Sequence, residues 1–373
     1  MNPLQQLRSE GQAIWLDYIR RDLLTSGELE RLVAEDGVTG VTSNPAIFQK
    51  AIGESDLYDD DIRALIDKRP DLSANELYEE LAVREIRMAA DVLRPVYEAE
   101  DGADGFVSLE VSPHLARDTE ATLAEARRLW RWVDRPNLMI KIPATDEGIP
   151  AIEETLADGI HVNVTLMFSL ADYEAVAGAF LRGVARAPEP ARAASVASFF
   201  VSRVDSKIDG KLEAIGTEEA RSLLGTIAIA NSMLAYRRFH ELFHGEAFAA
   251  LRGQGARPQR VLWASTSTKN PAYRDVVYVE ELIGAETVNT LPPATLTAFR
   301  EHGTVRRSLE EGMANADQPI RRLAAVGVDL DAATADLQRE GVEKFAEPFD
   351  RLLATLEEKR AALAAIAAAE TAG

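Results

Sequence analysis

Eight short runs of β-branched and other apolar residues recur along the chain, and longer segments with helical periodicity separate them. In one such segment, Thr119–Trp132, apolar residues recur at spacings of three and four. Strands that alternate with helices are typical of βα units around a parallel sheet. Eight units within 373 residues favour an α/β fold, a closed (β/α)8 TIM barrel with additional terminal helices, over an open doubly wound sheet. The expected strands are Ala13–Tyr18, Val38–Asn44, Phe106–Val111, Leu138–Pro143, His161–Phe168, Ser195–Val201, Arg260–Ser265 and Thr287–Pro292.

The domain organisation follows from what lies between these runs. No linker rich in Ser, Gly or Pro divides the chain, so we expect a single barrel domain over residues 1–373. About residues 1–12 would lead into the first strand. About residues 293–373 look helical and would pack on the barrel.

Composition removes several classes of function. The formal charge of −20, from 41 basic and 61 acidic side chains, argues against nucleic acid or an anionic membrane as a partner. Cysteine is absent, which excludes disulfides, thiolate nucleophiles and Cys-ligated metals. The N-terminus lacks an apolar signal segment, and the longest uncharged stretch, Ser222–Tyr236, has only 15 residues. We expect a cytoplasmic protein, either a monomer or a homodimer.

Polar residues interrupt the expected strands at positions that should face the barrel interior. Side chains alternate between the two faces of a strand. In the fourth strand, Leu138, Ile140 and Ile142 suit the helix-facing side, so Lys141 turns inward. The same reasoning turns Thr42, Ser198 and Phe200 inward. It also gathers six polar residues near the C-terminal strand ends: Asp17, Asn44, Glu110, Lys141, Asn163 and Thr165. Barrel enzymes place their chemistry at these ends, and buried charge is costly elsewhere, so a site is indicated.

The fifth expected strand, His161–Phe168, is the longest one on which the predicted alternation of side chains can be tested. Val162, Val164, Leu166 and Phe168 should all face the helices, on the opposite side from Asn163 and Thr165.

A buried lysine beside two carboxylates suits one kind of chemistry. Loss of water destabilises an ammonium relative to the free amine, and a free amine attacks a ketone to form a Schiff base. Its iminium accepts the electrons of a breaking C–C bond. Asp17 and Glu110 are the candidate acids and bases. The alternative, in which Lys141 only forms a buried ion pair with Glu110 or Asp17, stays open.

Six strings on consecutive expected strands carry a resemblance to a known family: GVTSNPAIF, VSLEVSP, MIKIPAT, HVNVTLMFS, ASFFVSRVD and ASTSTKNP. In this order they resemble transaldolases of the longer bacterial type, in the class I Schiff-base aldolase superfamily. The resemblance runs from Trp15 to Pro292. It implies a (β/α)8 barrel without metal or organic cofactor. It also implies transfer of a dihydroxyacetone unit from sedoheptulose 7-phosphate or fructose 6-phosphate to an aldose phosphate, glyceraldehyde 3-phosphate or erythrose 4-phosphate, in the non-oxidative pentose phosphate pathway.

The resemblance also implies roles for individual residues. Lys141 would form the Schiff base, and Asp17 would take the proton from the hydroxyl beside the breaking bond. Glu110 and Thr165, with a water, would move protons during imine formation and hydrolysis. The residues that would bind or surround the substrate are Thr42, Asn44, Asn163, Ser198, Phe200, Arg203, Lys269 and either Ser265 or Ser267. Shorter family members carry Arg where this chain has Lys269, which weakens the expectation of phosphate binding there.

The sequence also allows three other functions. A fructose-6-phosphate aldolase of the same superfamily would release dihydroxyacetone, but those relatives carry Gln and Tyr where this chain has Glu110 and Phe200. A non-catalytic barrel that binds sugar phosphates would form no covalent intermediate. His240 to His244 match the HExxH pattern of zinc proteases on an expected helix, with Glu246 or His302 as possible third ligands. In the resembling family this stretch is an outer helix, so we expect no metal.

Overall fold

Eight parallel strands close into a barrel in sequence order, and the last strand pairs with the first. The computed structural model describes residues 2–372, with the side chains of residues 2–363; residues 1 and 373 of the expected domain lie outside this part. The strands are β1 (Gln12–Asp17), β2 (Val38–Thr42), β3 (Phe106–Glu110), β4 (Leu138–Pro143), β5 (Val162–Met167), β6 (Ser195–Phe200), β7 (Arg260–Ala264) and β8 (Thr287–Leu291). The predicted (β/α)8 barrel is confirmed, and each predicted strand is present.

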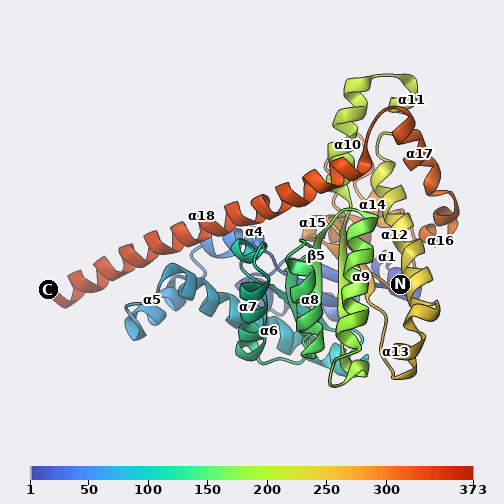
Figure 1. Cartoon of the computed structure of the whole chain (residues 1–373). Coiled ribbons are helices and arrows are strands. Elements are labelled where there is room, and N and C mark those ends of the chain that lie inside the picture. Colours follow the sequence, from blue (N-terminus) through green and yellow to red (C-terminus); the bar gives the residue numbers. More distant parts are fainter. Residues whose placement is uncertain (1, 373) are drawn as a thin grey trace.

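Helices surround the barrel on its outside (Figure 1). Before β1 lies α1 (Pro3–Ser9). Those between strands are α2 (Arg21–Thr25), α3 (Glu28–Arg31), α4 (Pro45–Phe48), α5 (Asp59–Lys68), α6 (Ala74–Ala99), α7 (Thr119–Val133), α8 (Gly148–Ala157), α9 (Leu170–Val184), α10 (Ser202–Ile215), α11 (Glu218–Arg221), α12 (Ile227–Phe243), α13 (Ala249–Gly253) and α14 (Val277–Glu280). After β8 come α15 (Pro293–His302), α16 (Ser308–Gly312), α17 (Asp317–Ala325) and α18 (Leu330–Ala372). Short helical turns are η1 (Leu32–Asp36), η2 (Gln49–Gly53), η3 (Pro113–Leu115), η4 (Pro190–Arg192), η5 (Glu246–Phe248) and η6 (Met313–Asn315). No described helix is long and apolar enough to cross a membrane.

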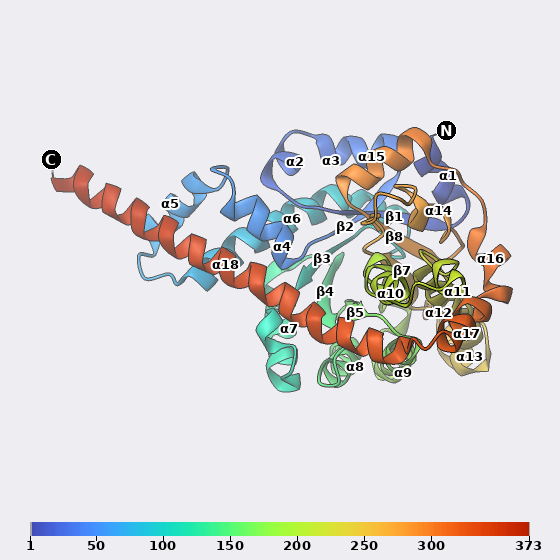
Figure 2. The ribbon, with the colours of Figure 1, turned by 90° about the horizontal axis from the view of Figure 1, so that it is seen from above.

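The longest helix, α18, has 43 residues and runs across one end of the barrel before it extends past α5 (Figure 2). It contacts α4, α5, α6 and α10, so it joins helices from opposite sides of the molecule. Its buried apolar side chains belong to the same hydrophobic cluster as the strands: Ala333, Leu337, Phe345, Phe349, Leu352 and Leu356. The helical segment after β8 therefore covers a barrel end that the strands leave open.

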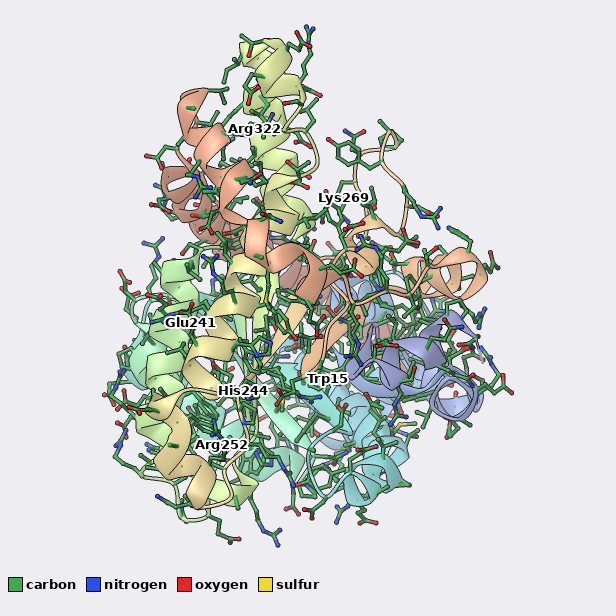
Figure 3. The ribbon with its side chains drawn as sticks, turned by 90° about the vertical axis from the view of Figure 1, so that its right-hand side faces the viewer. Trp15, Glu241, His244, Arg252, Lys269 and Arg322 are labelled. Atoms are coloured by element: carbon green, nitrogen blue, oxygen red, sulfur yellow. The ribbon has the colours of Figure 1, made fainter. Side chains whose placement is uncertain are left out.

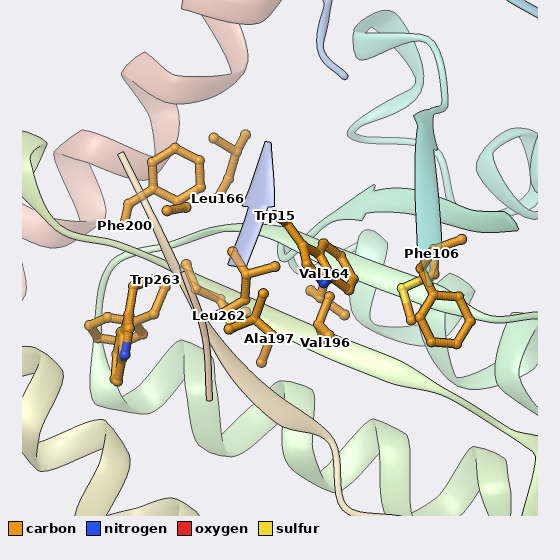
Figure 4. Packing of buried hydrophobic residues seen from close by; sticks show 14 of the residues in the cluster. Trp15, Phe106, Val164, Leu166, Val196, Ala197, Phe200, Leu262 and Trp263 are labelled. Carbon is orange, nitrogen blue, oxygen red and sulfur yellow. The ribbon is translucent and has the colours of Figure 1, made fainter. Parts of the chain in front are cut away.

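Buried apolar side chains pack closely around the strands of the barrel (Figure 4). Trp15 points inward and pairs in register with Gly40 on β2. A Cβ at Gly40 would lie 2.5 Å from the indole ring, so only glycine leaves room for it. The indole Nε1 donates to Asp104 Oδ1 at 2.8 Å. This packing fills the N-terminal end and leaves the polar inward residues at the other end.

The predicted alternation along β5 is wrong at Leu166. The β5–β6 register shifts between Val164 and Met167, and Leu166 has a φ of 60°. The irregularity turns its side chain to the barrel end, where a Cβ added at Gly341 of α18 would lie 2.9 Å from Leu166 Cδ2. Phe168, also predicted to face the helices, packs against the ring of Phe200 at 5.1 Å between centroids. A bulge of this kind re-aims the side chains that follow it.

Candidate active site

A cavity of about 330 Å³ opens at the C-terminal ends of the strands. It lies where barrels carry their functional residues. Most of the predicted site residues line it: Asp17, Thr42, Asn44, Lys141, Thr165, Ser198, Phe200, Arg203, Ser265, Ser267 and Lys269. Two others, Glu110 and Asn163, lie directly behind this lining, in contact with Lys141 and Ser198 respectively.

Lys141 extends from the middle of β4 into the cavity and is 6% exposed. Its Nζ donates to the carbonyl of Ser43 at 3.2 Å and lies 3.5 Å from Glu110 Oε2. On another side the Nζ lies 5.7 Å from the ring centre of Phe345, which belongs to α18. The amine is thus held by a carbonyl, a carboxyl group and an aromatic ring while it still faces the cavity.

Glu110 at the end of β3 is a buried carboxyl group. Burial raises its pKa to about 7, because the carboxylate loses water, although Lys141 acts in the opposite direction. Its Oε2 has no hydrogen-bond partner among the described residues, and neither has Thr165 Oγ1 on β5. A carboxyl group with a pKa near 7 can both give and take a proton at neutral pH. The two unpaired oxygens leave positions that a water molecule or a substrate hydroxyl can fill.

Asp17 stands at the end of β1 on the other side of the cavity. Thr42 Oγ1 on the neighbouring strand donates to Asp17 Oδ1 at 2.8 Å, so Thr42 fixes the direction of this carboxylate. The negative charge of Asp17 acts to raise the pKa values of Glu110, Arg203 and Lys269. Asp17 therefore lies among the charged groups of the cavity, close enough to act on each of them.

A second group of side chains makes one side of the cavity cationic. Burial lowers the pKa of the Arg203 guanidinium, whose Nη1 is buried without a hydrogen-bond partner among the described residues. Burial also lowers the pKa of Lys269, and repulsion from Arg203 and from Lys50 adds to the effect. The Lys269 Nζ donates to Ser267 Oγ at 2.7 Å. In contrast, Ser265 Oγ lies 2.9 Å from Ser202 Oγ, at the start of α10.

Two predicted binding residues make local hydrogen bonds. Asn44 caps α4, and its side-chain oxygen accepts from the backbone N–H of Ile47 at 3.0 Å. Asn163 is fully buried and does not line the cavity. It donates to Ser108 Oγ at 3.0 Å and accepts from Ser198 Oγ at 2.7 Å, so it connects β3, β5 and β6 beneath the site.

With this geometry established, comparison with known proteins gives the family. A family model described as Transaldolase/Fructose-6-phosphate aldolase matches residues 14–356. A transaldolase of Frankia alni is 52% identical over 360 residues, which cover 95% of this chain and 96% of the relative. The chain belongs to this family. A transaldolase of Thermobifida fusca is 51% identical over 366 residues, with 97% and 99% covered. One of Thiobacillus denitrificans is 49% identical over 360 residues, with 95% and 100% covered.

Among the residues of this transaldolase/aldolase family member that line the cavity without having been predicted, two come from helical segments and carry a charge or an aromatic ring. Lys50 comes from η2, just after α4, and Phe345 comes from α18. Alternation along strands identifies inward residues only on strands, so it gives no signal for a side chain that enters from a helix. For Lys50 a weak signal exists, because it follows the string GVTSNPAIF by two residues. For Phe345 we find none.

The HExxH pattern lies at the C-terminal end of α12, with His244 just after the helix, and Figure 3 shows Glu241 and His244 on the outside of the barrel, well away from Lys269. The rings of His240 and His244 stack at 5.0 Å between centroids, so the two lie on one face. His244 pairs with Glu286 at 2.7 Å, and His302 pairs with Asp275. Residues 2–363 contain no group of three or more His, Cys, Asp or Glu side chains placed to hold a metal.

Proposed function

We propose that the chain is a transaldolase that transfers a dihydroxyacetone unit through a Schiff base on Lys141. The donors would be fructose 6-phosphate and sedoheptulose 7-phosphate, and the acceptors glyceraldehyde 3-phosphate and erythrose 4-phosphate, in the non-oxidative pentose phosphate pathway. The observation that carries the proposal is the Lys141 amine, nearly buried at the cavity and 3.5 Å from a carboxyl group with a pKa near 7. A cytoplasmic location and a monomer or homodimer belong to the same proposal.

The first step joins the ketose to the enzyme. The free amine of Lys141 attacks the ketone carbon and gives a carbinolamine. Glu110 donates a proton to its hydroxyl, the C–O bond breaks, water leaves and the iminium forms. The raised pKa of Glu110 supplies the protonated form for this step and the ionised form for its reversal, in which Glu110, with Thr165, directs water onto the iminium.

The second step breaks and remakes a carbon–carbon bond. Asp17 accepts the proton of the hydroxyl on the fourth carbon, the bond between the third and fourth carbons breaks, and its electron pair moves into the iminium. The aldose phosphate leaves, and an enamine of three carbons remains on Lys141. That enamine attacks the aldehyde of a new aldose phosphate, and Asp17 returns its proton to the new hydroxyl. Thr42 holds the Asp17 carboxylate in place for both transfers.

The substrate phosphate would bind on the cationic side of the cavity, to Arg203, Lys269 and the hydroxyl of Ser267. Ser267 is favoured over Ser265 because it already contacts the Lys269 Nζ, whereas Ser265 is engaged with Ser202. Asn44 would hold a sugar hydroxyl with its amide N–H groups, since its oxygen caps α4. Asn163 and Ser198, joined by a hydrogen bond, would support the three-carbon unit beside Lys141, with Phe200 at its edge.

Transfer is favoured over simple aldol cleavage for two reasons. The relatives reported above are named transaldolases, although the family also contains fructose-6-phosphate aldolases. By resemblance, the aldolases carry Gln and Tyr where this chain has Glu110 and Phe200. An apolar ring beside the enamine supplies no proton, so it favours attack on an acceptor aldehyde over protonation and release.

Borohydride reduction tests the proposal directly. After incubation with fructose 6-phosphate and reduction, peptide mass mapping should find a reduced three-carbon adduct on Lys141. The variant Lys141→Ala should form no adduct and lose transfer activity while its circular dichroism stays that of the wild type. Lys211→Ala, which removes an exposed lysine from α10, is the matched control and should behave as the wild type. No adduct in folded wild-type protein would leave only the non-catalytic, sugar-phosphate-binding alternative.

A further inference from the structure

One face of α18 lies on the C-terminal end of the barrel. Along this helix, residues spaced by three and four meet the barrel or its surrounding helices, as expected for one face of an α-helix. They are Gln338, Gly341, Phe345, Phe349, Leu352 and Leu356. The helix thus covers the cavity rather than only packing on the outside of the molecule.

Contacts made by residues before Phe345 in α18 fix the distance of the helix from the cavity. Gln338 Nε2 donates at 2.8 Å to the carbonyl of Ala144, just after the strand that carries Lys141. A Cβ added at Gly341 would lie 2.9 Å from Leu166 Cδ2, so α18 packs closely against the side chain that follows the irregularity in β5. Glu340 forms an ion pair with Lys207 of α10 at 2.5 Å. The helix is therefore attached to β4, β5 and α10 within two turns of Phe345.

Contacts on the other side of Phe345 hold the helix along its continuation. Phe349 packs edge-on against Tyr78 of α6 at 5.3 Å between centroids and also meets His114. Asp350 lies 2.7 Å from His114 Nε2. Because α18 is held on both sides, Phe345 is positioned by the helix rather than free to swing with a loop.

The ring of Phe345 lies beside two side chains of the candidate site, Lys141 and Arg203. Its centre lies 5.7 Å from Lys141 Nζ and 5.8 Å from Arg203 Cζ. Arg203 Cζ also lies 5.3 Å from the ring centre of Phe200, so its guanidinium contacts both rings. Phe345 is 6% exposed and lines the cavity. It supplies an apolar wall on the side that the strands leave open.

We propose that Phe345 controls the partition of the three-carbon enamine between transfer and release, by keeping bulk water from the Schiff base. This inference rests on the proposed function. In release, the enamine carbon that would attack the acceptor aldehyde takes a proton instead, which gives an iminium. Water then adds to the iminium carbon and the C–N bond breaks. Dihydroxyacetone is released, and the amine of Lys141 is regenerated. Both the proton and the oxygen come from water. An enclosed apolar site slows these steps without slowing attack on a bound aldehyde.

The test is the ratio of dihydroxyacetone released to dihydroxyacetone transferred, measured with fructose 6-phosphate as donor and erythrose 4-phosphate as acceptor. Phe345→Ala should raise this ratio by on the order of tenfold, because water gains access to the enamine. Phe345→Leu, which keeps an apolar side chain of similar reach, should stay within about twofold of the wild type. A ratio of two products from the same intermediate does not depend on the fraction of enzyme that is folded.

Leu352→Ala is the matched control. It removes a buried apolar side chain from the same face of α18, two turns further on, where Leu352 lies near Gly53 of η2 rather than near Lys141. It should lower stability without changing the ratio. An unchanged ratio in Phe345→Ala, with the borohydride adduct still formed, would overturn the role of Phe345 and leave the proposed function intact. Loss of the adduct in the wild type would instead overturn the proposed function.

Discussion

The cations of the cavity differ from most of those elsewhere on the molecule. Lys141 pairs with Glu110, but Arg203, Lys269 and Lys50 form no ion pair with a carboxylate among the described residues. In a chain with 61 acidic and 41 basic side chains, carboxylates are plentiful. Leaving three cations around one cavity unpaired costs stability, since they repel one another. A bound dianion would relieve that repulsion, which is why we assign this side of the cavity to the substrate phosphate.

Lys50 should contribute to phosphate binding although no strand carries it. Lys50→Gln should raise the Michaelis constant for fructose 6-phosphate by roughly fivefold, the effect of losing an exposed charge interaction of about 1 kcal/mol. It should also weaken inhibition by inorganic phosphate to a similar extent. Lys50→Arg should retain most of both, because the charge remains.

Lys68→Gln is the control, since Lys68 is exposed at the end of α5 and lies outside the cavity. Equal effects of the Lys50 and Lys68 substitutions would mean that only the overall charge of the protein matters.

At the scale of residues, most of the candidate site could be predicted from the sequence. Strand alternation alone was enough to predict that Lys141, Glu110 and Asp17 face one interior, because a strand has only two faces and the apolar residues occupy one of them. It failed at Leu166, where a single positive φ interrupts the pleat. It also missed Phe345, because the position of a helix relative to a barrel depends on tertiary packing that no local pattern encodes.

At the scale of elements, α10 determines where Arg203 lies. This helix starts directly after β6, and Arg203 is its second residue. The same first turn is anchored by Asp205, whose carboxyl group accepts from Ala228 N at 2.7 Å and from Tyr278 Oη at 2.9 Å. These bonds tie α10 to α12 and α14. Burial raises the pKa of Asp205 to about 7, so the anchor carries a titratable group outside the cavity.

That anchor should make stability depend on pH. The pKa of Asp205 in the folded chain, about 7, lies above its ordinary value of 3.8. Its contribution to stability is therefore complete below about pH 3.8 and is lost as the pH rises through about 7. Between about pH 4 and pH 7 the free energy of unfolding of the wild type should fall relative to that of Asp205→Asn, by up to about 1.4 kcal/mol per pH unit.

Denaturant titrations at several pH values provide the measurement. The quantity compared is the slope with pH, since the substitution also changes the two hydrogen bonds. Glu213→Gln, which changes an exposed carboxylate of α10, is the control and should leave the slope unchanged. Parallel curves for Asp205→Asn and the wild type would contradict the assignment.

At the scale of the whole molecule, the strands, the outer helices and α18 share one hydrophobic cluster. The extent of the barrel could be predicted from eight regularly spaced apolar runs. The course of α18 could not, because a long helix with apolar residues can pack along the outside of a barrel as well as across its end. The continuity of the cluster supports the proposal that residues 1–373 form a single domain.

A single domain should unfold in one transition. On heating, catalytic activity, near-ultraviolet circular dichroism and far-ultraviolet circular dichroism should be lost with coincident midpoints, because α18 has no separate core. Loss of activity at a clearly lower temperature, with little change in the far-ultraviolet signal, would show that α18 detaches before the barrel unfolds.

The path of α18 also bears on when the protein becomes active in a cell. The ribosome completes all eight strands, with the lysine and its acids, well before it reaches the aromatic residue that closes them in. Domains begin to fold from the N-terminal side during synthesis. A nascent barrel would thus leave the Lys141 amine open to solvent until α18 has been synthesised and has packed across the strand ends.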